Sequence, residues 1–110
     1  MPHRLARINE LIRQELGKII FEQEEFDSGV LVTLMAAETS QDLRHTTLTV
    51  SVLPTERGAG VIKKLSAHVF NLQKQLNKKI RMHPVPKIRF VLDSTESESQ
   101  KINNLLEKIK

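Results

Sequence analysis

RHTTLTVSVL, at residues 44–53, is the stretch that decides the fold. Its second half places an apolar residue at every second position, namely Leu48, Val50 and Val52. A period of two is typical of a strand that is buried on one side only, since successive side chains point to opposite faces of a sheet. We therefore expect the apolar set to be buried and the alternating polar set to face solvent; the polar set is His45, Thr47, Thr49 and Ser51.

The residues before this strand predict a hairpin partner and a helix. Val30 to Glu38 is rich in aliphatic residues, and Val30-Leu31-Val32 is apolar on both sides, which favours a strand that is central or covered. Ser40-Gln41-Asp42 has the chemistry of a turn, so the short connection predicts a hairpin with residues 44–53. From His3 to Phe21 apolar residues recur at spacings of three and four, the pattern of an amphipathic helix.

The residues after the strand predict a loop, a long helix and a third strand. Pro54 to Gly60 has the composition of a loop. From Val61 to Ile80 apolar residues are spaced 4, 4, 3, 4 and 4 apart, as on one face of a helix, and Pro84 and Pro86 prevent its continuation. Lys87 to Asp93 alternates as a strand; the side chains expected to face inward are Ile88, Phe90 and Leu92.

A last helix is predicted toward the C-terminal end. Thr95-Glu96-Ser97-Glu98 is a capping-box pattern that would open it, and its apolar residues are Ile102, Leu105, Leu106 and Ile109. The expected order is helix, strand, strand, helix, strand, helix. That order predicts an α+β fold in which helices cover one face of a three-stranded mixed sheet. With 110 residues, the chain is expected to form a single domain over residues 1–110.

The composition excludes several classes of protein. The chain has no cysteine, which rules out disulfide scaffolds, thiol catalysis and cysteine-bound zinc, and which suits a reducing compartment. No apolar run approaches the roughly 18 residues of a membrane span, and the first residues carry no apolar signal segment, so we expect a cytoplasmic protein with no membrane partner. Its four histidines lack metal-ligand spacing, and there is no phosphate-binding glycine loop or nucleophile elbow. We therefore expect no enzyme, no metal and no cofactor.

Positive charge is concentrated in one segment. The net charge is +4, yet residues 57–89 hold nine basic residues and no acid. A concentrated positive region in a small domain favours binding to a phosphate backbone. The alternatives are a solvated lysine-rich helix face and a basic protein-interaction or DNA-binding module. The candidate RNA-binding residues are Lys63, Lys64, Lys74, Lys78, Lys79, Arg81, Lys87 and Arg89.

The rest of the chain is acidic overall. Outside residues 57–89 there are 8 basic and 13 acidic residues. Four of the acids lie together near the first bend: Glu22, Glu24, Glu25 and Asp27. Because phosphates repel carboxylates, we expect this acidic cluster to lie away from RNA and only to cap and solvate the end of the first helix.

The chain has few aromatic residues on which bases could stack. It has no Trp and no Tyr, and its four Phe residues are scattered. RNA-recognition sheets stack bases on exposed aromatic side chains, and the predicted strands offer no such set. Recognition is therefore expected to depend on backbone charge and shape.

Three parts of the sequence carry a resemblance to a known family. Arg4 to Ile12, together with Leu16 to Ile20, resembles the first helix of the ribosome-binding factor A family. Ser40 to Leu43 resembles the family's Ser-x-Asp-Leu turn. Arg81 to Phe90 with Asp93 resembles its run of arginine, proline, apolar residues, phenylalanine and aspartate. The order of the elements is similar to that of a type II KH domain.

The resemblance implies a type II KH-like fold and a bacterial factor that is not an enzyme. Such a factor binds 16S rRNA in the immature small (30S) ribosomal subunit and helps to process the ends of that RNA. We expect it to be a monomer. It also implies a bend between two helices in place of the Gly-x-x-Gly loop of other KH domains. Counting back from Arg81 places the bend near His68-Val69-Phe70, where the family's Ala-x-Gly residues are not matched. Phe70 lies off the apolar stripe, and we expect it to pack into the bend rather than to form an exposed contact.

Overall fold

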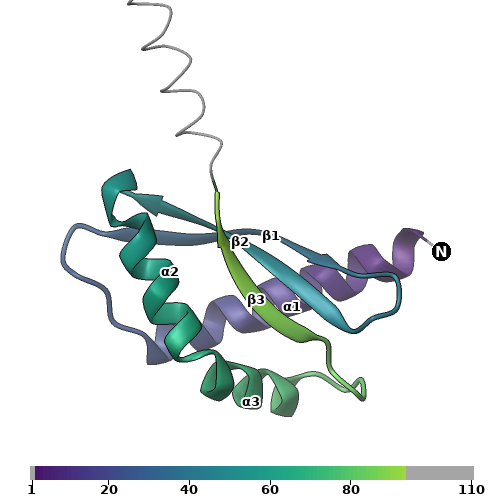
Figure 1. Cartoon of the computed structure of the whole chain (residues 1–110). Coiled ribbons are helices and arrows are strands. Elements are labelled where there is room, and N and C mark those ends of the chain that lie inside the picture. Colours follow the sequence, from purple (N-terminus) through teal and green to yellow (C-terminus); the bar gives the residue numbers. More distant parts are fainter. Residues whose placement is uncertain (1, 94–110) are drawn as a thin grey trace, which may run out of the picture.

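The computed structural model describes residues 2–93, which form three α-helices, a three-stranded sheet and one short 3-10 helix (Figure 1). Helix α1 spans Pro2–Gln23 and is followed by the strands β1 (Leu31–Thr39) and β2 (His45–Leu53). The 3-10 helix η1 (Thr55–Arg57) leads into α2 (Gly58–Ala67), α3 (Val69–Lys79) and the strand β3 (Lys87–Leu92). The described elements follow the predicted order, and the expected last helix lies outside the described residues.

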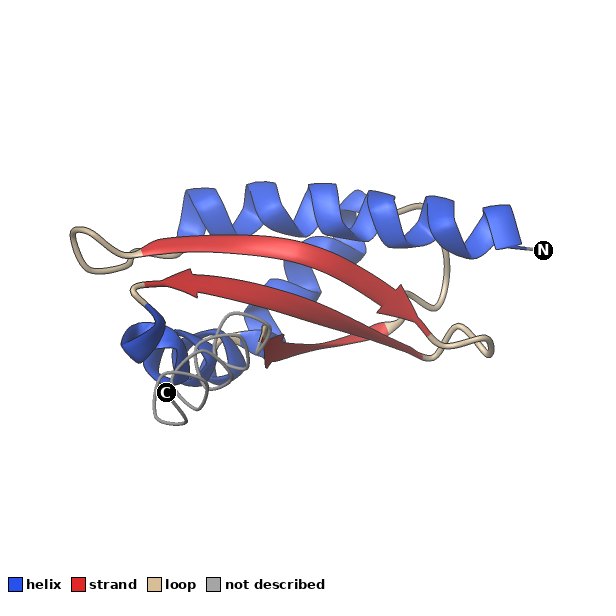
Figure 2. Ribbon diagram, turned by 90° about the horizontal axis from the view of Figure 1, so that it is seen from above, coloured by secondary structure: helices blue, strands red, loops and turns tan. Residues whose placement is uncertain are grey.

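β2 is the central strand of the sheet, whose order is β1-β2-β3. It pairs antiparallel with β1 and parallel with β3, so the sheet is mixed, as predicted (Figure 2). Leu48, Val50 and Val52 are buried. The alternating polar residues are half-buried on the other side of the strand: Thr47, Thr49 and Ser51. The predicted facing of this strand is therefore confirmed, since a slip of one residue would reverse the two sets.

β1 is an edge strand, so the prediction that it is central is wrong, and the cover that α1 provides reaches only one of its faces. Leu31 is 59% exposed and Met35 is 55% exposed. The apolar run at residues 30–32 carries no information on which strands become neighbours, and β3 occupies the other edge of β2. A register shift between Leu34 and Ala36 places a β-bulge at Met35, which bends this edge.

The start of α2 packs closely against the end of β3. Residues 58–60, expected in a loop, are helical. Gly58 is buried, and a Cβ atom there would lie 2.8 Å from Leu92 Cδ1, so the missing side chain lets the helix approach the strand. Ile88 and Phe90 face the core as predicted, but Leu92 is 39% exposed, because it is the last residue of the strand and lies at the rim of the sheet.

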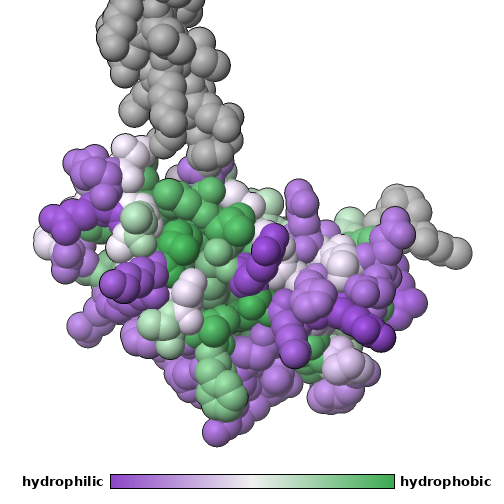
Figure 3. Space-filling model, viewed as in Figure 1, coloured by the Kyte–Doolittle hydropathy of each residue, from purple (hydrophilic) through white to green (hydrophobic). Residues whose placement is uncertain are grey.

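The helices cover one face of the sheet, as predicted, and within residues 2–93 no helix lies on the other face (Figures 1 and 2). α1 packs on β1 and α3, while α2 packs on β2 and β3. On the surface, apolar side chains gather between α2 and β3, with hydrophilic side chains on either side (Figure 3). The buried apolar residues form one cluster: Ile12, Leu16, Ile19, Ile20, Ala37, Leu48, Val50, Val52, Val61, Leu65, Leu72, Leu76, Ile80, Ile88 and Phe90.

The turn between β1 and β2 is held by hydrogen bonds to Ser40 and Asp42. The Asp42 carboxylate accepts from the Ser40 hydroxyl at 2.5 Å and from the backbone N–H of Arg44 at 3.1 Å. The Ser40 hydroxyl oxygen also accepts from the N–H of His45 at 3.1 Å. These bonds support Leu43 at a φ of 61°, a left-handed conformation that costs a non-glycine residue about 1–2 kcal/mol. The hydroxyl of Ser40, and then the N–H of Arg44, hold the pKa of Asp42 below its ordinary value.

Asp42→Ala should destabilise the turn in a pH-dependent way. The pKa of the carboxyl is lower in the folded chain, so its contribution to stability is present above the unfolded pKa of about 3.9 and is lost as the pH falls through the folded pKa. The variant should therefore differ more from the wild type in its free energy of unfolding near about pH 7 than near about pH 2. Urea unfolding at both pH values measures this, with the exposed Gln41→Ala as a control. A difference of equal size at both pH values would exclude a role for the carboxylate charge.

Candidate nucleic-acid interface

A kink at His68 divides the helical segment after β2 into α2 and α3. His68 has a φ of −100° and a ψ of 9°, outside the values of a helix. Its N–H donates to the carbonyls of Lys64 and Leu65 at 3.1 and 3.2 Å, which closes α2, and its carbonyl accepts from the N–H of Leu72 at 3.0 Å, which opens α3. The bend predicted near His68-Val69-Phe70 is confirmed, and it forms without a glycine.

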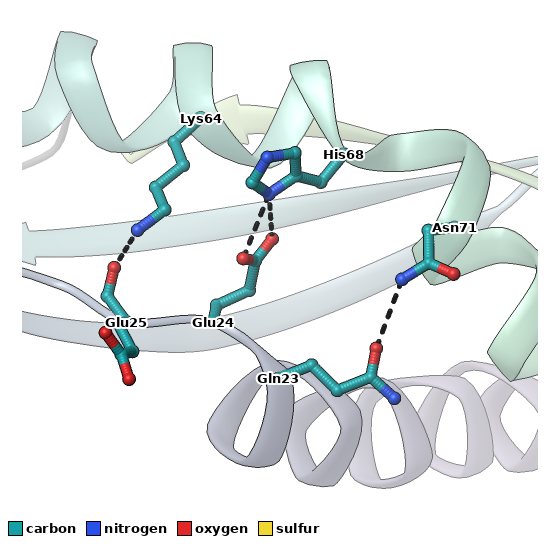
Figure 4. A network of polar contacts seen from close by, with 6 residues as sticks. All are labelled: Gln23, Glu24, Glu25, Lys64, His68 and Asn71. Carbon is teal, nitrogen blue, oxygen red and sulfur yellow. Dashed lines mark hydrogen bonds and ion pairs between the residues drawn. The ribbon is translucent and has the colours of Figure 1, made fainter.

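Polar contacts tie this kink to the end of α1 (Figure 4). The two carboxylate oxygens of Glu24 lie 2.8 and 3.0 Å from His68 Nδ1. The side-chain amide of Asn71 donates to Gln23 Oε1 at 3.3 Å. One pair is made at the kink residue and the other in the first turn of α3, so the end of α1 is attached to the junction of α2 and α3.

The acidic cluster does more than cap and solvate a helix end, which corrects the expectation from the sequence. Next to Glu24, the backbone carbonyl of Glu25 accepts a hydrogen bond from Lys64 Nζ, and that ammonium group lies 5.1 Å from the centre of the Phe26 ring, within cation–π range. Asp27 Oδ2 lies 3.3 Å from Arg57 Nη1. The segment after α1 therefore binds the basic segment of the same chain.

The outer side of α3 presents three of the lysines predicted to contact phosphates. Lys74, Lys78 and Lys79 are exposed, whereas Leu72 and Leu76 are buried and set the inner side of the helix. Within the described part of the chain, no hydrogen bond or ion pair engages these three lysines. Their charges are available to an external partner.

Phe70 does not pack into the bend, so that prediction is wrong. Its side chain is 83% exposed. Leu72, two positions later, marks the buried side of α3, and two positions correspond to more than half a turn of a helix. Phe70 therefore points away from the core, beside the lysines of α3.

The two cations of β3 lie on the open face of the sheet. Ile88 and Phe90 are buried on the side of the helices, so the alternating Lys87 and Arg89 project from the opposite side. Arg89 Nε donates to Thr47 Oγ1 of β2 at 3.0 Å. The predicted residues thus occupy two surfaces, the outer side of α3 and the open face of the sheet, which meet at the edge of β3.

The remaining predicted residues differ in their surroundings. Lys63 is exposed on α2, whereas Lys64 is half-buried and is already engaged with Glu25. Arg81 is exposed directly after α3. Among the eight predicted residues, Lys64 therefore has its ammonium group bound within the protein, to the carbonyl of Glu25.

Arg81 lies in a basic groove that the sequence alone does not reveal. The groove has a volume of about 560 Å³ between the start of α1 and the segment after α3. Arg4 and Arg7 share one side of α1 because they are three residues apart, and they meet Arg81 because α1 packs on α3. The spacing of the two arginines is visible in the sequence, but their distant partner is not. The groove is lined by Arg4, Arg7, Ile8, Leu11, Ile80, Arg81 and Met82.

The chemistry that these surfaces offer is electrostatic. In residues 2–93 no three His, Cys, Asp or Glu side chains gather in a way that could hold a metal ion. The helices of this part are too short or too polar to cross a membrane. Exposed cations with no acid in their own segment can bind phosphate groups by charge.

Known proteins of one family match this chain along most of its length. The sequence profile described as ribosome-binding factor A matches residues 4–106. Ribosome-binding factor A of Xanthomonas axonopodis pv. citri is 30% identical over 104 residues, which cover 94% of this chain and 80% of that protein. The protein of the same name from Akkermansia muciniphila is 29% identical over 109 residues, which cover 99% of this chain and 86% of that protein.

Solved structures share the fold. The crystal structure of ribosome-binding factor A from Thermus thermophilus aligns with a TM-score of 0.70 at 23% identity and covers 80% of this chain and 94% of that chain. A homology model of the Thermus thermophilus factor, fitted into a cryo-electron microscopy map of a 30S complex, aligns with a TM-score of 0.61 at 22% identity, over 84% of this chain and 94% of that chain. Because the profile covers nearly the whole sequence and the described elements have the KH-like fold of these structures, the chain belongs to the ribosome-binding factor A family.

Proposed function

We propose that this protein binds 16S rRNA within the small (30S) ribosomal subunit or its precursor and promotes the processing of that RNA as a non-enzymatic assembly factor. It acts in the cytoplasm as a monomer and needs no cofactor. The observation that supports this proposal most directly is membership of a family of which one member has been fitted into the map of a 30S complex.

Attraction to the RNA backbone supplies most of the affinity in this proposal. Lys74, Lys78 and Lys79 stand exposed on α3, and residues 57–89 contain no acid that would repel phosphate. Each phosphate that a cation neutralises releases counterions, so the affinity falls as the salt concentration rises. On the open face of the sheet, the guanidinium of Arg89 can donate two parallel hydrogen bonds to one phosphate, which adds geometry to charge.

The double variant Lys78→Gln/Lys79→Gln should weaken binding to purified 30S subunits and flatten its salt dependence. If about four to six cations engage phosphates, log K should fall with log salt at a slope of magnitude roughly 3–5, and removing two cations should reduce that slope by up to about two units. The fold should persist, because exposed substitutions usually change stability by no more than about 0.5 kcal/mol. Binding titrations at several salt concentrations measure both quantities.

A matched control removes two cations outside the basic segment. Lys18 on α1 and Arg44 in the hairpin turn are exposed, and Lys18→Gln/Arg44→Gln should bind and respond to salt nearly like the wild type. Equal losses in the two double variants would mean that only the net charge matters. Full affinity after changing Lys78 and Lys79 would place the RNA surface elsewhere, first in the groove that holds Arg81.

A basic protein-interaction or DNA-binding module is the alternative function. Competition separates it from the proposed one: small-subunit RNA should displace the protein from 30S subunits at lower concentration than duplex DNA of the same length. Displacement by both at the same concentration would favour a module that recognises charge without regard to the kind of nucleic acid.

A further inference from the structure

Most sides of α3 are occupied by contacts within the protein. Leu72 and Leu76 are buried in the core. Asn71 donates to Gln23 at the end of α1, and Gln73 is bonded to the backbone of Pro86 and Ile88 at the start of β3. The side that remains carries Phe70, Lys74 and Lys78, all of them exposed.

Phe70, Lys74 and Lys78 form a line along this free side. They are spaced four residues apart, which places each about one turn beyond the last in a helix of about 3.6 residues per turn. The core gains little from Phe70, which is 83% exposed, so folding does not account for an aromatic side chain at this position. The ring is presented to solvent at one end of a row of cations.

We propose that Phe70 is a stacking platform for an unpaired base of RNA, and that Lys74 and Lys78 bind phosphates next to that base in the same strand. The inference rests on the proposed function and adds to it the kind of RNA that is recognised, a single-stranded segment. Aromatic stacking combined with a cationic track is how proteins bind single strands, since every base has a π-face. A duplex would offer phosphates to the lysines but no free face to the ring.

The surroundings of the ring favour RNA over a protein partner. Phe21 provides a comparison within the same chain, because it is 89% exposed on α1. Phe21 is followed along the chain by Glu22, Glu24 and Glu25, which repel phosphate, whereas Phe70 is followed along its own side of α3 by Lys74 and Lys78. Glu24 lies near the kink but is paired with His68. Two similarly exposed rings therefore differ in the charge of the residues that follow them, and the cations after Phe70 favour a polyanion.

Phe70→Ala should weaken binding to purified 30S subunits by about 5- to 150-fold, the range expected for the loss of one stacked base. The slope of log K against log salt should keep its wild-type value, because the ring neutralises no phosphate. Phe70→Tyr keeps the aromatic face and should bind within about twofold of the wild type. Phe21→Ala is the matched control and should bind like the wild type. Both Phe→Ala variants should keep the wild-type midpoint of thermal unfolding, since the side chains removed are exposed.

A photoreactive benzoylphenylalanine placed at position 70 identifies what the ring touches in the 30S complex. The expected result is a crosslink to an unpaired nucleotide of 16S rRNA. Unchanged affinity of Phe70→Ala, no rescue by Phe70→Tyr, or any crosslinking result other than an unpaired nucleotide would overturn the inference. The proposed function would survive such results if Lys78→Gln/Lys79→Gln still binds weakly, whereas failure of the wild-type protein to bind 30S subunits would overturn both.

Discussion

Leu48→Ala is expected to lower the free energy of unfolding by about 2–5 kcal/mol. Leu48 is fully buried in the central strand, where it is paired with Ala37 of β1 and Phe90 of β3. The change removes buried apolar groups and leaves a cavity that the neighbouring side chains fill only in part. Urea unfolding followed by circular dichroism measures the loss.

Leu53→Ala is the matched control, because it makes the same substitution at the end of the same strand. Leu53 is 41% exposed, so less apolar area leaves the core and the loss of stability should be clearly smaller than for Leu48. Similar losses for the two variants would show that burial does not distinguish these positions. A nearly neutral Leu48→Ala would contradict the assignment of the core.

The central strand could be predicted from the sequence because its signal is local. The alternation of Leu48, Val50 and Val52 with small polar residues fixes which side of β2 is buried, whatever lies on that side. The position of β1 at the edge of the sheet could not be predicted in this way. It depends on where β3 pairs, and no pattern within residues 30–38 reports that pairing.

The position of the kink could be predicted from the family resemblance, but its cause could not. Helical periodicity continues through His68, and no glycine or proline interrupts it, so the pattern alone permits a straight helix. The residues that hold the bend, Gln23 and Glu24, lie more than forty positions away in the sequence. In the sequence they lie within a run of acidic residues, which is more often a solvated surface than a contact.

In the candidate interface too, features set by a local sequence pattern could be predicted, and features set by tertiary packing could not. The exposure of Lys74, Lys78 and Lys79 follows from a stripe of apolar residues on the other side of the helix, which the sequence displays. Phe70 is exposed because it lies off that stripe, and its hydrophobic character does not bring it into the core. The groove around Arg81 depends on the packing of α1 on α3, which only the fold reveals.

Side-chain amides from the helices occupy both outer edges of the described sheet. Asn9 Oδ1 of α1 accepts from the N–H of Thr39 on β1 at 2.9 Å. At the start of β3, Gln73 Oε1 accepts from the N–H of Ile88 at 2.8 Å, and Gln73 Nε2 donates to the carbonyl of Pro86, the residue before the strand, at 3.1 Å. These are backbone groups that a further strand would pair with, so Gln73 blocks edge-to-edge association at β3.

Gln73→Ala should lower the free energy of unfolding by about 1–3 kcal/mol, because the partly buried N–H of Ile88 and carbonyl of Pro86 both lose their partner. The effect should also be local: the amide hydrogen of Ile88 should exchange faster with solvent, since it loses the acceptor that Gln73 Oε1 provides. Gln75→Ala is the control, since it makes the same change on the same helix at a half-buried residue that forms no side-chain hydrogen bond to the described residues. Its loss of stability should be smaller, and Ile88 should keep its protection. Equal losses and equal exchange in the two variants would mean that the packing of α3, and not the amide of Gln73, holds the edge of β3.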